Sequence, residues 1–479
     1  MITRFARLEF ELFTKPSKSD FLRVHQICLM TPSLILINPW ICDFAAYDLW
    51  SKPLGLLYLA GYLRCCGFRI HLIDCLDVHH PGMKGDKSMK KPKRRLYGTG
   101  KFWRQEVPKP LPLSIIPRPY SRYGLSLNIF VEELNKIRKP AAILITSLMT
   151  YWYPGVKEVI SLARKVHPEV PIILGGIYAR LCHNHARQNM HADRIATSND
   201  PASLLKSLSE FGIPIPKLPA DSGHPPYPAF DLLSQIDYVC LLTSKGCPYR
   251  CKYCASHFLD PQPIHRDPGE VLEEILFWYK DYKVRDFAYY DDALLIDAEK
   301  HLALLLEKLA RHHPDLRFHT PNAVHVKEIT AEIASLMHQT GFRTIRLGLE
   351  TSDFSLHRNL DNKIAEGDFE RAVQYLLKAG FAHNEIGAYI LMGLPGQSVD
   401  SVMETIDFIA NTGAMPFLSE YSPIPHTALW EKAISHSEYN LTSEPLFHNN
   451  TILPCWDNSQ KKDLSRLKRR ISEIREKYR

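Results

Sequence analysis

The ten residues Lys245-Gly246-Cys247-Pro248-Tyr249-Arg250-Cys251-Lys252-Tyr253-Cys254 decide how the rest of the chain is interpreted. Their cysteines follow the pattern C-x3-C-x2-C. Three thiolates leave a tetrahedral zinc one ligand short, because structural zinc takes four. They can instead hold three irons of a four-iron cluster and leave the fourth iron open to a ligand. Two alternatives stay open: a cluster of structural cysteines, and a zinc site completed by His257.

The spacing, with the aromatic Tyr253 directly before the last cysteine, resembles the radical S-adenosylmethionine (radical SAM) superfamily. The resemblance implies that Cys247, Cys251 and Cys254 hold a 4Fe-4S cluster and that Tyr253 lies at the SAM site. In the superfamily the amino and carboxylate groups of SAM chelate the open iron. One electron then cleaves SAM reductively and yields a deoxyadenosyl radical.

Composition describes an ordinary globular chain of two or three domains. Of its 479 residues, 45% are apolar and 23% are charged, and the net charge of +7 is no strong argument for nucleic acid. The 11 cysteines form no regular disulfide framework, which favours reduced thiols and a cytoplasmic location. No run of about 18 apolar residues predicts a membrane-spanning helix. Residues 1–30 are expected to form an N-terminal extension.

The first half alternates between strands and helices, which predicts a doubly wound, Rossmann-like α/β domain over residues 31–213. Short apolar runs indicate buried parallel strands, and Pro53–Cys65 and Val156–Val166 have the spacing of helices. The expected strands are Leu34–Asn38, Arg69–Asp74, Ala141–Ser147 and Pro171–Gly176.

A basic and aromatic insertion at about 81–123 interrupts this alternation. Its lysines are expected to be a solvated loop. The stretch from Tyr97 to Trp103 is a candidate lid over a ligand or substrate.

A proline-rich linker at 214–236 is followed by six strand–helix units over 237–425. The six units match the partial (β/α)6 barrel that the resemblance to radical SAM enzymes implies, and in barrels the chemistry lies at the carboxyl ends of the strands. The cysteine loop follows the first of these strands. The expected strands are Val239–Thr243, Asp286–Tyr290, Arg317–Thr320, Thr344–Leu349, Glu385–Met392 and Phe417–Tyr421. The expected helices are Glu270–Tyr282, Glu299–His312, Ile329–Gln339, Phe369–Ala379 and Val399–Asn411.

Residues 426–479 are expected to form a C-terminal segment that ends in a basic amphipathic helix. Its apolar stripe, with Leu464, Leu467, Ile471, Ile474 and Tyr478, is expected to pack on the barrel. Contact with a membrane surface is the alternative.

Several strand ends carry residues suited to SAM. Asp291 and Asp292 end the second barrel strand, where the superfamily contacts the SAM amino group, although the usual Gly-Gly-Glu form is absent. Asn322 follows the third strand. Glu350 ends the fourth and resembles the acidic residue that family members direct at SAM. Met392 and Gly393 end a strand that resembles the one in contact with adenine. No catalytic residue is assigned.

The first domain followed by this barrel resembles the cobalamin-binding class of radical SAM enzymes, many of them methyltransferases. The resemblance implies that small residues after the third and fourth strands line the cobalamin nucleotide tail: Ser147, Thr150, Gly175 and Gly176. The D-x-H-x-x-G motif of other cobalamin proteins is absent, and many radical members also lack it.

These resemblances imply a radical SAM enzyme that cleaves SAM reductively and, with cobalamin, methylates an unactivated carbon of an unidentified substrate. The alternative is a radical SAM enzyme without cobalamin, whose first domain recognises the substrate. The expected partners are a small-molecule or natural-product substrate and an electron donor such as flavodoxin or ferredoxin. Nucleic acid is not expected.

Overall fold

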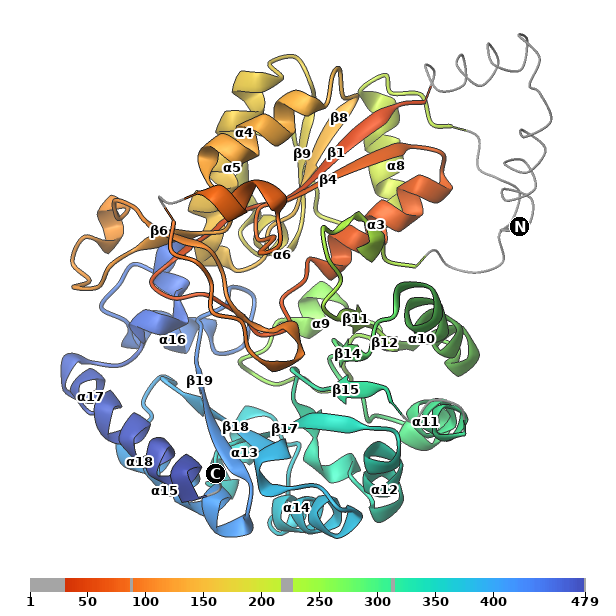
Figure 1. The fold of residues 1–479 in the computed structure, drawn as a ribbon. Coiled ribbons are helices and arrows are strands. Elements are labelled where there is room, and N and C mark those ends of the chain that lie inside the picture. Colours follow the sequence, from red (N-terminus) through yellow and green to blue (C-terminus); the bar gives the residue numbers. More distant parts are fainter. Residues whose placement is uncertain (1–30, 87–88, 217–226, 312–314, 478–479) are drawn as a thin grey trace.

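Two parallel sheets, each covered by helices, make up the molecule in the computed structural model, which describes residues 31–86, 89–216, 227–311 and 315–477 (Figure 1). The first sheet stands above the second in Figure 1, and the C-terminal helices lie along one side of the second. The expected extension at 1–30 lies outside the described residues, and so does 217–226 of the expected linker.

The first sheet has five parallel strands in the order β10-β9-β8-β1-β4. The chain passes from β1 to β4 on one side and returns to β8 on the other, so the order reverses beside β1. Ligands of such sheets bind at the carboxyl ends next to this reversal. The strands are β1 Ser33–Asn38, β4 Arg69–Asp74, β8 Ala142–Ile145, β9 Ile172–Leu174 and β10 Arg194–Ile195. The first four match the expected strands, and β10 adds a fifth.

Both faces of this sheet are buried, as its continuous apolar strands predict. In β1, Leu34 and Leu36 join one apolar cluster, with the helix α3 Leu54–Cys65. Ile35 and Ile37 join another, with α4 Leu127–Lys136 and α5 Tyr153–Val166. The sheet is therefore a rigid support for the turns at its carboxyl edge.

The second sheet is an open barrel of six parallel strands in the order β11-β14-β15-β17-β18-β19, with the short β16 paired beside β17. The pairing among the described strands does not close on itself, so the barrel is partial. The strands are β11 Val239–Leu241, β14 Asp286–Tyr289, β15 Arg317–His319, β16 Val324–His325, β17 Phe342–Glu350, β18 Ile386–Met392 and β19 Met415–Glu420. Covering helices are α10 Pro268–Tyr282, α11 Leu302–Ala310, α12 Ala331–Gln339, α14 Asp368–Ala379 and α15 Val399–Thr412.

The insertion and the segment before α3 form short strands that sequence reasoning did not foresee. β2 Ile41–Asp43, β7 Ser121–Tyr123 and β6 Arg104–Glu106 make one antiparallel sheet, and β3 Tyr47–Asp48 pairs with β5 Gly100–Lys101. Trp50 and Tyr97 lie against His319 of the barrel, with ring centroids 4.1 and 4.6 Å away. The insertion and the segment before α3 therefore both attach the first unit to the barrel.

The last helix, α18 Leu464–Lys477, buries Leu467, Ile471 and Ile474 in the barrel core beside α15. This confirms the expected packing of its apolar stripe for the described residues. No helix in the described part of the chain combines the length and the apolar character needed to cross a membrane.

The segment before α18 crosses to the carboxyl edge of the first sheet. His448 Nδ1 lies 3.0 Å from Thr150 Oγ1, and Tyr151 donates its hydroxyl to Asn450 Oδ1 at 3.0 Å. Asn449 donates to the buried Asp43 at 2.8 Å. The C-terminal segment therefore holds the two units together at the edges where their strands end.

Substitution of Gly176 tests the packing of this edge. Gly176 has φ +92°, and a Cβ there would lie 2.2 Å from the carbonyl oxygen of Ser147. We expect Gly176→Ala to lower the free energy of unfolding by about 2 kcal/mol or more, because a left-handed backbone and a backbone overlap both oppose the methyl group. Urea unfolding measures this loss.

The neighbouring Gly175→Ala is the control, since its Cβ would meet only Ala196 Cβ at 3.8 Å. Equal losses for the two variants would contradict this account of the turn.

Candidate functional site

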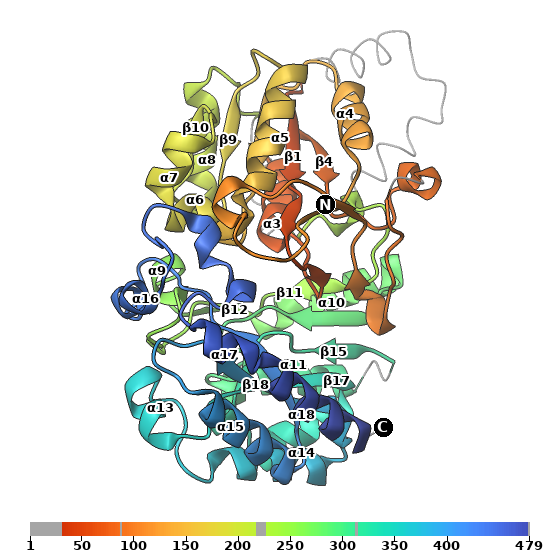
Figure 2. The ribbon, with the colours of Figure 1, turned by 90° about the vertical axis from the view of Figure 1, so that its left-hand side faces the viewer.

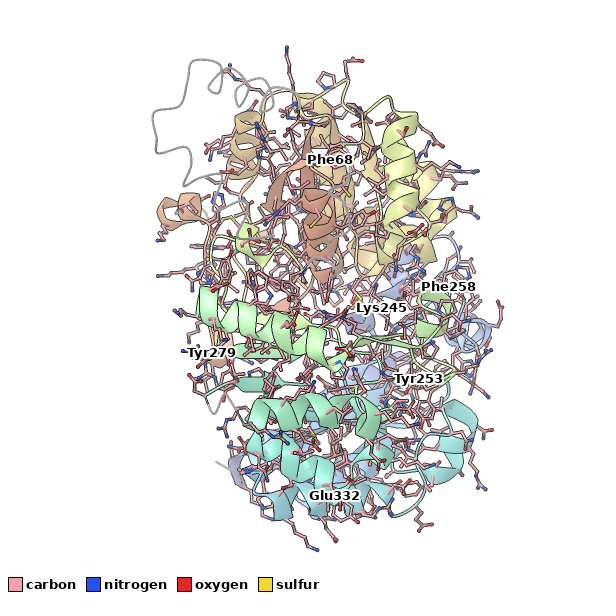
Figure 3. All side chains as sticks on the ribbon, turned by 90° about the vertical axis from the view of Figure 1, so that its right-hand side faces the viewer. Phe68, Lys245, Tyr253, Phe258, Tyr279 and Glu332 are labelled. Atoms are coloured by element: carbon pink, nitrogen blue, oxygen red, sulfur yellow. The ribbon has the colours of Figure 1, made fainter. Side chains whose placement is uncertain are left out.

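The three cysteines lie on one loop at the carboxyl end of β11. The loop starts from the hairpin of β12 Ser244–Lys245 and β13 Ile264–His265 and runs into α9 Ser256–Leu259. Two long-range backbone bonds hold it: Lys252 donates to Leu360 O at 2.8 Å, and Leu429 donates to Lys252 O at 2.9 Å. Figure 3 shows Lys245, Tyr253 and Phe258 near one side of the molecule, at the level where its two units meet.

The thiols sit in a partly buried environment. Cys251 is buried, and Cys247 and Cys254 are half-buried. Burial raises the pKa of Cys247 and raises the pKa of Cys251 to about 11, while the ammonium of Lys363 acts in the opposite direction on both. Metal binding would therefore release protons from these thiols.

The donor set fits a four-iron cluster. Cys254 interacts electrostatically with both other thiols, so the three groups are neighbours. Among the described residues, no three His, Cys, Asp or Glu side chains converge on one metal-ion position. A cluster does not require such convergence, because each cysteine binds a different iron.

Tyr253 and Glu350, both expected at the SAM site, are brought together by the fold. The Tyr253 hydroxyl donates to Glu350 Oε1 at 3.0 Å, although 97 residues separate them. Glu350 ends β17 at a break in the strand register and has φ +67°. Residues held in such strained conformations cluster at functional sites.

Lys363 completes this group and was missed by the sequence reasoning. Its ammonium donates to the Tyr253 hydroxyl at 3.0 Å and lies 3.5 Å from Glu350 Oε1 and 3.7 Å from Asp361 Oδ2. Burial alone would lower the pKa of Lys363, but the charges of Glu350, Cys251 and Asp361 raise it. The lysine stays charged beside the cysteine loop. No motif marks it in the sequence, because its partners are distant along the chain.

The two aspartates after β14 have different surroundings. Asp291 is buried and accepts hydrogen bonds from the backbone and hydroxyl groups of both Thr243 and Ser244. These hydrogen bonds occupy its carboxylate and hold the start of the cysteine loop. Asp292 is exposed, and its charge acts on Cys247. Of the two, Asp292 is the one available to an external amine.

The remaining SAM candidates line neighbouring strand ends. Asn322 is exposed and donates to the carbonyl oxygen of Tyr290 at 2.9 Å, beside the aspartates. Met392 is buried in the barrel core. The N–H of Gly393 bonds to Gln397 Oε1 at 2.9 Å, and a Cβ there would lie 3.0 Å from Leu453.

The residues expected to line a cobalamin tail meet at the carboxyl edge of the first sheet. Ser147 donates to Gly175 O at 2.6 Å, and Thr150 is bonded to His448. A Cβ on Gly176 would overlap Ser147, whereas Gly175 has space beside it. These residues fit a cobalamin tail that passes over the backbone of Gly175. The hydroxyls of Ser147 and Thr150 already have hydrogen-bond partners within the protein.

Comparison with known proteins identifies the class of the second unit. Residues 241–409 match the family model of the radical SAM superfamily. The chain therefore carries a radical SAM domain, which confirms the expected superfamily and implies a 4Fe-4S cluster and SAM as cofactors.

Among curated proteins, the cytidylyl-2-hydroxyethylphosphonate methyltransferase of Streptomyces wedmorensis is 20% identical over 85% of this chain and 83% of that protein. An uncharacterized methyltransferase of Pyrococcus horikoshii is 23% identical, over 44% of this chain and 47% of that protein. The chain thus spans about half the length of that relative.

Among solved structures, the radical SAM methyltransferase TsrM of Kitasatospora setae aligns with TM-score 0.61 and 15% identity, over 90% of this chain and 84% of that one. The cobalamin-dependent enzyme OxsB aligns with TM-score 0.55 and 13% identity, over 93% of this chain and 56% of that one. The expected fold class, a doubly wound domain followed by a partial barrel, is confirmed.

The Lys363 contacts predict a measurable stability effect. We expect Lys363→Met to lower the free energy of unfolding by about 3 kcal/mol, because it leaves the buried carboxylate of Glu350 without its cation, while Asp361 keeps the His357 ring at 3.1 Å. Urea unfolding of the protein without cofactors measures it.

Lys252→Met, an exposed lysine of the same loop, is the matched control and should change stability by less than about 0.5 kcal/mol. If both substitutions cost the same, the proposed pairing of Lys363 is wrong.

Proposed function

We propose that this protein is a radical SAM methyltransferase that binds cobalamin and methylates an unactivated carbon of a small molecule. The observation that carries the proposal is the convergence of the cysteine loop with Tyr253, Glu350 and Lys363 at the carboxyl ends of the barrel strands. Radical SAM enzymes bind SAM at that end of the barrel. The carboxyl ends of the strands of the first sheet point toward the same region. When bound, the cluster would supply the electron that splits SAM, and cobalamin would carry the methyl group.

The chain's own residues have separate roles in this proposal. Cys247, Cys251 and Cys254 would hold the cluster, and Asp292 would receive the SAM amino group because its carboxylate is exposed beside Cys247. Tyr253 would position Glu350, and Asn322, Met392 and Gly393 would border the nucleoside. Asp291 would keep the cysteine loop in place rather than touch SAM.

Support for cobalamin comes from the named relatives. TsrM has been solved with cobalamin and a [4Fe-4S] cluster bound, and OxsB with aqua-cobalamin and SAM. The tail would pass over Gly175, beside Gly176, Ser147 and Thr150. The second candidate, a radical SAM enzyme without cobalamin, is favoured by the hydrogen bonds that the C-terminal segment already makes with Thr150 and Tyr151.

The domain boundaries belong to the proposal as well. We assign 31–213 to the cobalamin-binding unit, with the insertion at 81–123, and 237–425 to the radical SAM unit, joined by 214–236. Residues 426–479 would close the space between the two units. The proposal also includes a cytoplasmic location and an electron donor such as flavodoxin or ferredoxin. It does not include a membrane surface, since the stripe of α18 packs in the barrel core.

Iron content tests the assignment of the cluster ligands. Wild-type protein reconstituted without oxygen should hold about four irons per chain. Cys254→Ser should lose most of them, because the cluster would keep only two cysteines. Cys65→Ser removes an exposed thiol of α3 and serves as the control. Equal iron content in both variants would reject the C-x3-C-x2-C loop as the metal site.

Cobalamin retention separates the two candidate functions. Protein purified with cobalamin available should keep one cobalamin per chain through gel filtration, as its optical spectrum would show. We expect Gly175→Leu to abolish this retention, because the side chain would fill the space over which the tail passes. Protein that never retains cobalamin would favour the enzyme without it.

A further inference from the structure

A cavity of about 580 Å³ opens where the two units and the C-terminal segment meet. Its walls come from α6 Ile177–Leu181 and α7 His183–Asn189 of the first unit, α9 beyond the cysteine loop, and α16 Trp430–His436 with the residues around it. Figure 2 shows α6, α7, α9 and α16 on the same side of the molecule. We call it the histidine pocket, after its lining residues His183, His185, His426 and His448.

The histidine pocket is adjacent to the proposed radical chemistry. Phe258 in its wall belongs to α9, which begins two residues after Cys254, and Ser256 bonds to the Cys254 sulfur at 3.3 Å. Arg180 donates to the carbonyl oxygen of Leu259 and so connects the first unit to the same short helix. A molecule in this pocket would therefore lie against the element that follows the cluster ligands.

The lining favours an anion. It contains Arg180 and four histidines, and no aspartate or glutamate lines it among the described residues. Burial lowers the pKa of His185 and lowers the pKa of His448 to about 4, so the positive charge of the lining comes from Arg180. No ion pair joins Arg180 to a carboxylate within the described part of the chain. The Nδ1 atom of His183 is buried and lacks a hydrogen-bond partner there. Buried polar atoms are normally paired, so this ring nitrogen is suited to a ligand.

The lining also offers flat aromatic surfaces. Phe258 is 41% exposed, and His426 stacks on it with ring centroids 4.3 Å apart and an interplanar angle of 2°. Trp430 adds a third ring to the wall. His426 has φ +68° and also bonds to Leu181 O at 3.0 Å. A non-glycine residue held in this conformation is typical of ligand clamps.

We propose that the histidine pocket binds the substrate, a small molecule that carries an anionic group beside a planar ring. Arg180 and His183 would bind the anion, and Phe258, His426 and Trp430 would stack against the ring. This inference rests on the proposed function, since it names the substrate class of that radical site. Carboxylate, phosphate and sulfonate groups share the required chemistry.

The probe for this pocket is 1-anilinonaphthalene-8-sulfonate, which joins a sulfonate to fused rings. Its uncharged counterpart, N-phenyl-1-naphthylamine, has the same rings without the sulfonate. We expect the full-length protein to bind one sulfonate dye per chain in equilibrium dialysis. Arg180→Gln should weaken that binding roughly tenfold and change the uncharged dye less than about twofold. Trp430→Leu should weaken both dyes.

Two variants keep the test specific. Arg187→Gln removes an exposed arginine of α7 outside the pocket and should leave both dyes bound as in wild type. Arg180→Lys keeps the charge and should retain most of the sulfonate binding, which separates loss of charge from a folding defect. Sulfonate binding that is unchanged by Arg180→Gln, or equally weakened by Arg187→Gln, would overturn the proposal.

Cobalamin also carries a phosphate and a planar base in its nucleotide tail, so the dialysis is repeated on cobalamin-loaded protein. Unchanged dye binding supports a substrate pocket separate from cobalamin. Loss of the dye on loading would assign the pocket to the tail and overturn the substrate assignment. Dye binding requires no cluster, so a protein that binds the dye and fails to hold iron would contradict the proposed function alone.

Discussion

The largely buried ammonium of Lys363 holds the candidate site together. It bonds to Tyr253 in the cysteine loop and lies close to Glu350, the last residue of the fourth strand along the barrel sheet. The loop is otherwise anchored by backbone bonds and by the fully bonded Asp291. A loop that carries three metal ligands needs such anchors, because cluster ligands must be held in place before the metal can fix them.

The second constraint is the direction of the strands. Both sheets are parallel, so the carboxyl ends of the strands of each sheet lie along one edge. The C-terminal segment forms hydrogen bonds at this edge of the first sheet and lies against Gly393 at the end of β18 in the second. The insertion adds a separate contact through Tyr97 and His319. The histidine pocket lies between the first unit, α9 and the C-terminal segment.

Much of this organisation could be predicted from the sequence. The apolar runs located four strands of the first sheet and all six main strands of the barrel, and the cysteine spacing identified the superfamily. The two-residue strands β3 and β5 were not predictable, because their pairing joins segments about 50 residues apart and leaves no periodic signal. Lys363 could not be predicted either, because its partners are distant along the chain. Adjacent aspartates could not be told apart either, since only the fold shows that Asp291 is buried and Asp292 exposed.

Low-temperature electron paramagnetic resonance of the reduced, reconstituted protein tests the central claim most directly. The account predicts the spectrum of a reduced four-iron cluster that changes when SAM is added, with coupling to the nitrogen of SAM labelled at its amino group. Such coupling would mean that one iron is open and binds SAM. A four-iron spectrum that SAM leaves unchanged, or a site that holds zinc instead of iron, would contradict the account.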